Sequence, residues 1–467
     1  MRFALGVFFL CAAAAVASPA QTFTTLANFD LTNGSWPESS PVQGADGNLY
    51  GTASQGGEFA SGIVFKMAPD GTLTTLYSFC SQTNCTDGFE PQAGLILATD
   101  GNFYGSVFAG GAQFEGAVYK ITPQGSLTVL YSFCSQTACA DGYAPLAAPI
   151  QATDGNFYGT TLYGGAYGDN FENNYGTVFK MTPRGALTTL HSFAGTDGAN
   201  PTRLVQATDG NFYGTTQVGG AYNYGTVFKI TPQGTFTTLY NFCAQTACAD
   251  GRIPTSGLVQ ANNGDFYGTT TEGGTDSSGT VFRITPGGSL TTLKSFDSND
   301  GGSPTGLTQA TDGNFYGTAS SGGANADGTV FEITAKGALT ILHSFDKTDG
   351  SQPDGGISQA TSGLLYGTTL FGGASNDGTV FSLSVGLGRF IETIPTVGRV
   401  GESVTILGNN LMGSTAVSFN GIPATTFTAA NTSIKVRVPT GATTGTVEVT
   451  TATGEILKSN VAFRVIP

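Results

Sequence analysis

The sequence repeats itself, and this repetition limits the possible folds more than any other feature. Variants of the phrase DGNFYGT recur every 49–55 residues, with their tyrosines at Tyr50, Tyr104, Tyr158, Tyr213, Tyr267, Tyr316 and Tyr366. Each period holds four short segments rich in Val, Phe, Tyr and Thr; in the fourth copy they read RLVQAT, NFYGTT, GTVFKI and TFTTLYNF. Four strands per unit, no helical pattern and seven units predict an all-β fold, a seven-bladed β-propeller.

The two ends of the repeat region predict how the propeller closes. The seventh copy stops after GTVFSL at residues 378–383 and lacks the outer TTLYSF strand of the other copies. A matching segment, TFTTLANF, stands at residues 22–29. We therefore expect the N-terminal strand to complete the last blade, which leaves no open sheet edge in the ring.

The turn residues predict which loops lie on each of the two faces of the propeller. The first hairpin turn is usually Asp-Gly, as at Asp154-Gly155, and the third is Pro-x-Gly, so both are short turns whose glycine permits a positive φ. These turns account for much of the glycine content, 69 of 467 residues, about twice the usual share. The second connection and the link between blades vary in length, and one connection is extended between Gly165 and Gly176. Binding surfaces usually lie on such a variable face.

Two further residue types recur at fixed positions of the repeats, an acid or asparagine in the link and a glutamine on the innermost strand. The phrase [DN]-G-x-x-P begins at Asn33, Asp87, Asp141, Asp197, Asp250, Asp300 and Asp349. We interpret its acid as a turn former that bonds nearby backbone, with a ring of cation sites as the alternative. Glutamines stand on the innermost strand at Gln43, Gln151, Gln206, Gln260, Gln309 and Gln359, with Leu97 in the second repeat. We expect them to line a wet central channel where water satisfies their amides.

The repeat phrases resemble known propeller families. DGNFYGT followed by Gly-Gly is similar to the repeats of two-component regulator sensors, with tyrosine in place of their tryptophan. The longer phrase, from GNFYGTT to GTVFKITPxGxLTTLYSF, resembles the bacterial tandem-repeat family called GloVer over residues 22–386. That family is known from predicted extracellular proteins, and the resemblance implies no established activity or catalytic residues.

The repeat stops near residue 389, where the composition changes. The phrases IPTVGRVGESVTILGNNL, VSFNGIPATTF and SIKVRVPTGATTGTVEVTTATGE resemble an IPT/TIG domain, which implies an immunoglobulin-like β-sandwich. The alternating segments at residues 434–438 and 447–451 fit paired strands. We thus expect a signal peptide at 1–20, a propeller at 21–386 and an IPT/TIG domain at 389–467.

The first residues and the cysteines predict export. Arg2 precedes an apolar run over residues 3–16 with small residues after it, as in a secretory signal peptide; a lipoprotein signal ending at Cys11 is the alternative. The remaining six cysteines form three near pairs in the phrases FCSQTNCTDG, FCSQTACADG and FCAQTACADG. We predict disulfides Cys80–Cys85, Cys134–Cys139 and Cys243–Cys248 in a secreted, extracellular or periplasmic protein that is free or associated with the cell surface. A zinc site is the alternative, although the pairs lack CxxC spacing.

Charge and histidine content exclude several functions. The net charge of −14 opposes binding to nucleic acid or an anionic membrane, and no later run is long enough to span a membrane. The only histidines, His191 and His343, replace the tyrosine of LYSF in two repeats. We expect them to pack in strands, which leaves no histidine-based catalytic site, no metal site and no cofactor.

The extended connection and its neighbour supply the candidate binding residues. AYGDNFENNYG and AYNYG carry Tyr167, Asp169, Phe171, Glu172, Tyr175, Tyr222 and Tyr224, with Glu58, Glu90 and Glu115 at repeat positions nearby. Exposed aromatics beside acids and amides suit sugar stacking; packing of the loop onto its neighbour is the alternative. We predict a non-catalytic module that binds a glycan or a protein, with two alternatives: a carboxylate-dependent polysaccharide hydrolase or lyase, and a structural cell-surface protein.

Overall fold

The computed structural model describes residues 21–167 and 175–466. The described chain is all-β, apart from three short 3-10 turns. Up to Ser384 its strands form seven antiparallel sheets, six of four strands and one of five, here called sheets I–VII. The predicted signal peptide at 1–20 lies outside the described residues. Within those residues no helix has the length and apolar character needed to cross a membrane.

The strands of sheets I to VI are consecutive along the chain. Sheet I contains β2 (Val42–Gln43), β3 (Leu49–Ala53), β4 (Ile63–Met67) and β5 (Leu73–Ser78). Sheet II contains β6 (Ile96–Leu97), β7 (Phe103–Val107), β8 (Ala117–Ile121) and β9 (Leu127–Ser132). Sheet III contains β10 (Ile150–Gln151), β11 (Phe157–Thr161), β12 (Thr177–Met181) and β13 (Leu187–Ser192). Sheet IV contains β14 (Ala199–Pro201), β15 (Val205–Gln206), β16 (Phe212–Val218), β17 (Thr226–Ile230) and β18 (Phe236–Asn241).

The remaining repeat sheets have the same plan. Sheet V contains β19 (Val259–Gln260), β20 (Phe266–Thr270), β21 (Thr280–Ile284) and β22 (Leu290–Ser295). Sheet VI contains β23 (Gly302–Gln309), β24 (Phe315–Ser321), β25 (Thr329–Ile333) and β26 (Leu339–Ser344). Sheet VII contains β27 (Ile357–Gln359), β28 (Leu365–Thr369), β29 (Thr379–Ser384) and β1 (Thr22–Asn28). The 3-10 turns are η1 (Thr83–Cys85), η2 (Thr137–Cys139) and η3 (Thr246–Cys248).

The repeated phrase FYGT builds the contacts between sheets. In sheet III, Tyr158 stacks on Phe212 of sheet IV with ring centroids 4.1 Å apart, and its hydroxyl donates a hydrogen bond to Asp154 of the Asp-Gly turn. The glycine after the tyrosine has to be small, because a Cβ at Gly159 would lie 2.5 Å from the ring of Phe179 on the next strand. In this phrase the tyrosine thus packs against the next sheet and bonds to the preceding turn, and the glycine allows two strands to approach closely.

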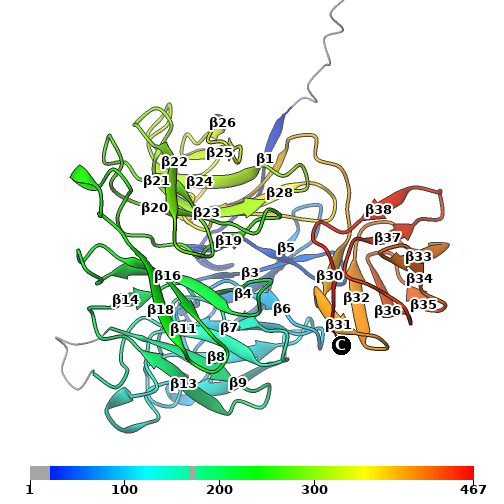
Figure 1. The fold of residues 1–467 in the computed structure, drawn as a ribbon, viewed down its shortest axis with the longest axis horizontal. Helices are drawn as coiled ribbons and strands as arrows, with labels where there is room; N and C mark the ends of the chain where they lie inside the picture. Colours follow the sequence, from blue (N-terminus) through cyan, green and yellow to red (C-terminus); the bar gives the residue numbers. More distant parts are fainter. Residues whose placement is uncertain (1–20, 168–174, 467) are drawn as a thin grey trace, which may run out of the picture.

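The N-terminal strand completes the last sheet, as the sequence predicts. β1 pairs antiparallel with β29, from Thr22 opposite Ser384 to Asn28 opposite Thr379, and Figure 1 shows blue β1 beside the yellow β28 region. Separate hydrophobic clusters join sheets I to II, II to III, III to IV, IV to V, V to VI and VI to VII. A further cluster, which includes Phe29, Phe65 and Val380, joins sheet VII back to sheet I.

The glutamine column bonds to protein, which corrects the expectation that water satisfies these amides. Each glutamine oxygen accepts a hydrogen bond from a backbone N–H of the preceding sheet, at 2.8–3.1 Å. For example, Gln206 accepts from Thr153 at 2.9 Å while its amide nitrogen donates to Gly210 O. These six hydrogen bonds, here called the glutamine belt, join neighbouring sheets. The corresponding hydrogen bond between sheets I and II is missing because residue 97 is a leucine.

The C-terminal residues form a separate two-layer unit. One sheet contains β30 (Glu392–Ile394), β32 (Ser403–Leu407), β36 (Ser433–Arg437) and β35 (Phe427–Ala429). The other contains β34 (Ile422–Pro423), β33 (Ala416–Phe419), β37 (Val447–Thr450) and β38 (Ile456–Lys458), and β31 (Val397–Arg399) pairs with β39 (Arg464–Ile466). Valines, isoleucines and phenylalanines of both sheets share one core. This orange-to-red unit lies to one side of the repeat sheets in Figure 1.

The C-terminal unit contacts the repeat region at the Asp-Gly turns. Thr432 donates to the carbonyl of Ala45 in sheet I, and Asn409 donates to the hydroxyl of Thr361 in sheet VII, both at 2.8 Å. Arg464 donates to the carbonyl of Thr208 in sheet IV. The unit therefore bonds to the first hairpin turns of sheets I, IV and VII.

Candidate functional site

The variable loops and the links between sheets meet at the end opposite the Asp-Gly turns. The second connection of each sheet, here called the tip loop, starts at a Gly-Gly pair and ends at the glycine of GTVF. The carbonyls of Ser61 and Glu115 in the tip loops of sheets I and II accept from Glu90 N and Ala144 N of the next links, at 3.0 and 2.9 Å. Tyr175 and Asn200 make the same contact between sheets III and IV. The tip loops of sheets I, II and III are thus each joined to the link that leads into the next sheet.

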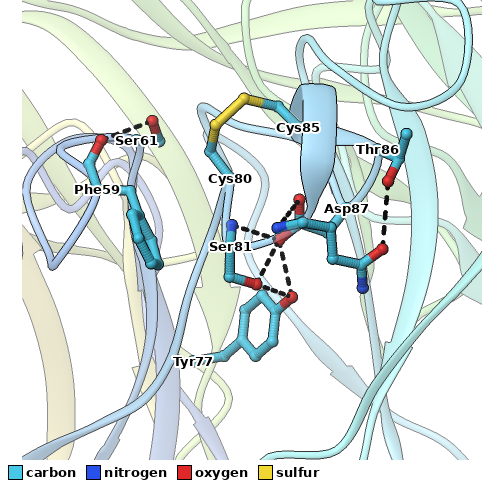
Figure 2. The surroundings of a disulfide bond; sticks show 9 residues. Phe59, Ser61, Tyr77, Cys80, Ser81, Cys85, Thr86 and Asp87 are labelled. Atoms are coloured by element: carbon cyan, nitrogen blue, oxygen red, sulfur yellow. Dashed lines mark hydrogen bonds between the residues drawn. A yellow bond between two sulfur atoms is a disulfide. The ribbon is translucent and has the colours of Figure 1, made fainter.

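The acid of the [DN]-G-x-x-P phrase organises each link. Asp87 is fully buried and accepts hydrogen bonds from the Tyr77 hydroxyl, from the backbone and side chain of Ser81, and from the backbone of Gln82, at 2.7–3.3 Å. Figure 2 shows these bonds converging on the carboxylate next to the disulfide. Burial, with the bond to Asp87 acting in the same direction, raises the pKa of Tyr77 to about 12, so the hydroxyl stays protonated. The turn-forming role of this acid is borne out here.

The three predicted disulfides are confirmed. Cys80–Cys85, Cys134–Cys139 and Cys243–Cys248 each close a short link loop around a 3-10 turn. Asp141 and Asp250 are buried beside the second and third disulfides, with the same tyrosine and backbone partners as Asp87. The disulfide and the carboxylate therefore occur together in these links.

Both histidines have structural contacts. His191 stacks on Phe236 with ring centroids 4.0 Å apart and bonds Asp197 through Nε2 at 2.8 Å. His343 likewise stacks on Phe23 and bonds Asp349 at 2.7 Å. Each histidine takes the place that Tyr77 has in sheet I, so the strand-packing prediction agrees with their surroundings.

A cavity of about 660 Å³ opens between sheets III and IV at the tip-loop end. Its aromatic walls are Tyr143, Tyr163 and Tyr175, and its polar walls include Thr196, Asn200 and Asn223. The Tyr143 and Tyr163 rings lie 5.4 Å apart at 41°. Burial, with Glu115 and Tyr163 nearby, raises the pKa of Tyr143. Among the described residues that line this cavity, none is charged.

The predicted binding residues fall into three groups. Tyr175 lines the cavity, while Tyr167 and Tyr222 lie exposed on the tip loops of sheets III and IV. Tyr224 is half-buried beneath the Arg252 guanidinium, 5.2 Å from its ring centroid, so it packs in the sheet. Asp169, Phe171 and Glu172 lie outside the described residues.

Sequence reasoning missed most of the cavity wall. Tyr143 and Tyr163 belong to the phrases DGYAP and TLYGG, where the other repeats mostly have other residues. These departures from the repeat were a usable signal. Asn200 and Asn223, however, reach the cavity through neighbouring sheets, which no single repeat reveals.

A group of carboxylates occupies another part of the tip-loop end. Glu38 and Asp354 each follow the proline of their link, in sheets I and VII, and the adjacent Ser40 N donates to Gly355 O at 3.0 Å. Burial raises the pKa of both, and Asp354 and Glu90 add to the shift of Glu38. Glu58 is exposed, and Glu115 is half-buried on the loop beside the cavity. No group of three His, Cys, Asp or Glu side chains in residues 21–167 and 175–466 is arranged to hold a metal ion.

Comparisons with known proteins identify both parts of the chain. The model of the Gloeobacter/Verrucomicrobia repeat matches residues 6–170, 74–264, 147–381 and 244–416, and the IPT/TIG domain model matches residues 391–465. No curated protein matches the sequence.

Several solved structures resemble the chain at low sequence identity. A fungal alcohol oxidase of the AA5 family, solved with copper, has a TM-score of 0.52 at 13% identity over 96% of this chain and 99% of its own. PorZ, a surface component of the type-IX secretion system of Porphyromonas gingivalis, has a TM-score of 0.46 at 14% identity over 90% and 58%. A gluconolactonase of Xanthomonas campestris has a TM-score of 0.41 at 14% identity over 80% and 92%. At 13% identity the likeness to the oxidase concerns the fold alone.

Proposed function

Since this chain belongs to the Gloeobacter/Verrucomicrobia repeat family and carries a C-terminal IPT/TIG domain, we propose that it is a secreted, non-catalytic module that binds an uncharged glycan. Its residues 21–386 form a seven-bladed β-propeller closed by β1, and residues 389–467 form the second domain. The cycle of hydrophobic clusters from sheet I to sheet VII and back supports the propeller. The three disulfides support an oxidising, extracellular location.

The observation that supports a glycan ligand is the lining of the cavity between sheets III and IV, where tyrosines stand beside amides and no described lining residue is charged. Its volume of about 660 Å³ lies within the range of ordinary ligand sites. Sugars present apolar C–H faces, which stack on aromatic rings, and hydroxyls, which bond to amide groups such as those of Asn200 and Asn223. The described lining residues offer no basic side chain to pair with an acidic sugar.

The test is direct binding. A glycan array that holds neutral glucans, mannans and xylans beside anionic polysaccharides should return a neutral ligand, whose affinity is then measured by calorimetry. Tyr163→Ala and Asn223→Ala should each weaken that affinity about ten-fold, the loss of one good contact. Asn376→Ala is the matched control, because Asn376 has the same tip-loop position and the same φ of 63° in sheet VII. An array without any ligand would refute the proposal.

A second candidate function is that of a polysaccharide hydrolase or lyase that uses the carboxylates of the tip-loop end. It is favoured by Glu38 and Asp354, because their raised pKa values suit a general acid. In this case the protein releases new reducing ends, by hydrolysis of a neutral polysaccharide or by elimination from one that contains uronic acids, and Glu38→Gln or Asp354→Asn abolishes the release. Binding without any release on a broad polysaccharide panel would leave the binding module alone.

A further inference from the structure

Four consecutive tip loops present an exposed aromatic ring. The rings are Phe59, Phe114, Tyr167 and Tyr222, from sheets I to IV, with exposed fractions of 43%, 56%, 56% and 51%. The tip loops of sheets V, VI and VII place Asp276, Asn325 and Ser375 at the position of Phe59 and Tyr222. The exposed aromatic residues of the tip loops therefore occupy one arc, sheets I to IV, and the tip loops of sheets V to VII, here called the polar arc, carry polar residues at this position. Exposed aromatic clusters of this kind mark interaction sites.

The backbone at Phe114 gives independent evidence that its ring is needed. Phe114 has a φ of 65°, and its counterparts in the other tip loops with this left-handed conformation are Ala60, Asn223, Ser277, Ala326 and Asn376. Small residues and asparagine tolerate this conformation, whereas a bulky side chain is strained there. Because the ring is more than half exposed, core packing does not explain its presence. Strain that packing does not explain is typical of functional positions.

The arc is continuous with the cavity. Asn223 lines the cavity and follows Tyr222 in the chain. On the other side, Glu115 follows Phe114, accepts the backbone bond of Ala144 at 2.9 Å and contributes to the raised pKa of Tyr143 in the cavity wall. The backbone bond from Glu90 N to the Ser61 carbonyl connects the link before sheet II to the tip loop that holds Phe59. Figure 2 shows Phe59 near the disulfide Cys80–Cys85.

We propose that Phe59, Phe114, Tyr167 and Tyr222 form one stacking platform that extends the cavity site and binds a long, uncharged polysaccharide chain across sheets I to IV. This inference rests on the proposed function and specifies the length and charge of its ligand. Repeated sugar faces match repeated exposed rings. Glu58 and Glu115 flank the two phenylalanines, so an anionic polymer would meet repulsion along the platform.

Chain length tests the platform apart from the cavity. The probes are mixed-linkage β-glucan, glucomannan, arabinoxylan and amylose, each compared with its own tetrasaccharide, and polygalacturonate as the anionic polymer. We expect the bound polymer to have at least ten-fold higher affinity than its tetrasaccharide. The double variant Phe59→Ala/Phe114→Ala should weaken polymer binding about ten-fold and change tetrasaccharide affinity less than two-fold. Asn325→Ala and Ser375→Ala, on the polar arc, are the matched controls and should leave both affinities unchanged.

Each outcome separates the two proposals. If no neutral glycan of any length binds, the proposed function and the platform both fail. If the tetrasaccharide binds and the polymer binds no tighter, or if the double variant binds polymer normally, the platform fails and the cavity site stands. Preferential binding of polygalacturonate would overturn the uncharged ligand.

Phe114→Asn checks that the variant protein is intact and that the strain is real. Phe114→Asn and Phe114→Ala both lack the ring, but asparagine tolerates the left-handed backbone better. Phe114→Asn should therefore melt at a higher temperature than Phe114→Ala while losing as much polymer affinity. A higher polymer affinity for Phe114→Asn than for Phe114→Ala would contradict a stacking role for the ring.

Discussion

Removal of the buried carboxylate of Asp87 should destabilise the protein more than removal of the neighbouring disulfide. Asp87 has no exposed surface and accepts four hydrogen bonds, from Tyr77, from Ser81 twice and from Gln82. Hydrogen bonds to a charged group contribute about 1.5–3 kcal/mol each and are not additive. Asp87→Ala leaves neutral donors without their acceptor, at about 1–3 kcal/mol for each donor that stays buried, and the loss of such a buried network reaches about 3–5 kcal/mol. We expect a loss in this range for Asp87→Ala.

The disulfide Cys80–Cys85 closes a short loop, with a sequence separation of five. Loop closure of this length restricts the unfolded chain by about 2 kcal/mol. Comparison of the repeats also indicates that the carboxylate matters more than the disulfide, because Asp197 and Asp349 accept equivalent bonds in links that have no cysteines. The carboxylate is therefore the shared element of the links, and the disulfide is an addition to three of them.

The measurement is guanidinium unfolding at pH 7 of the parent, Asp87→Ala, Cys80→Ser/Cys85→Ser and the combined variant. We expect the free energy of unfolding to fall by about 3–5 kcal/mol for Asp87→Ala and by about 2 kcal/mol for the cysteine variant. Asp276→Ala, an exposed loop acid, is the control and should change it by less than about 0.5 kcal/mol. A cysteine variant that loses as much stability as Asp87→Ala would refute this reasoning.

Three further predictions follow from the links and the belt. Gln206→Leu should lower the free energy of unfolding by about 1 kcal/mol because it removes the bond from Thr153, whereas Leu97→Gln should not lower it; thermal unfolding of both variants checks this. The pKa of Asp197 is lowered, since bonds from His191 and Ala194 N outweigh the opposing effect of burial; its stabilisation is thus present above about pH 4 and is lost as the pH falls through the lowered pKa, so Asp197→Asn should flatten the acid limb of a pH–stability curve. The denatured, unreduced mature protein should show no free thiol by a thiol-reactive dye, and six would contradict the disulfides.

Repeated features were predictable from the sequence because each copy confirms the others. The position of β1 against β29 follows from a strand missing at residue 384 and present at residue 22. The disulfides, the link carboxylates and the packing of His191 follow from comparing equivalent positions. The groups that form the disulfides and the link bonds lie within one repeat, and β1 and β29 lie at the two ends of the repeat region, so the one-dimensional pattern contains the information. For His191 the pattern gives the strand position but not its stacking partner, Phe236 of the next sheet.

Features that join different repeats were not predictable in the same way. Glu38 and Asp354 are more than three hundred residues apart and approach each other only after the cycle closes. The partner of each glutamine lies in the preceding sheet, 47–53 residues away for five of them and 318 residues away for Gln43, and the expected solvation by water was wrong for that reason. The cavity combines side chains from two sheets and a link. Such contacts depend on the angle between neighbouring sheets, which the repeat pattern does not contain.

The two ends of the repeat sheets differ in how their charges are used, and this difference favours the tip-loop end for binding. At the Asp-Gly turns, Lys66, Lys180 and Lys229 pair with turn aspartates at 2.8–3.0 Å. The C-terminal unit also bonds to this end, through Thr432 and Arg464. Four of the 18 basic residues are thereby engaged at the Asp-Gly turns, away from the tip loops. The tip-loop end carries Glu38, Glu58, Glu90 and Glu115. Because the chain carries a net charge of −14, its overall field opposes anionic ligands, and the cavity, whose described lining residues carry no charge, together with the exposed rings beside it suits a neutral ligand.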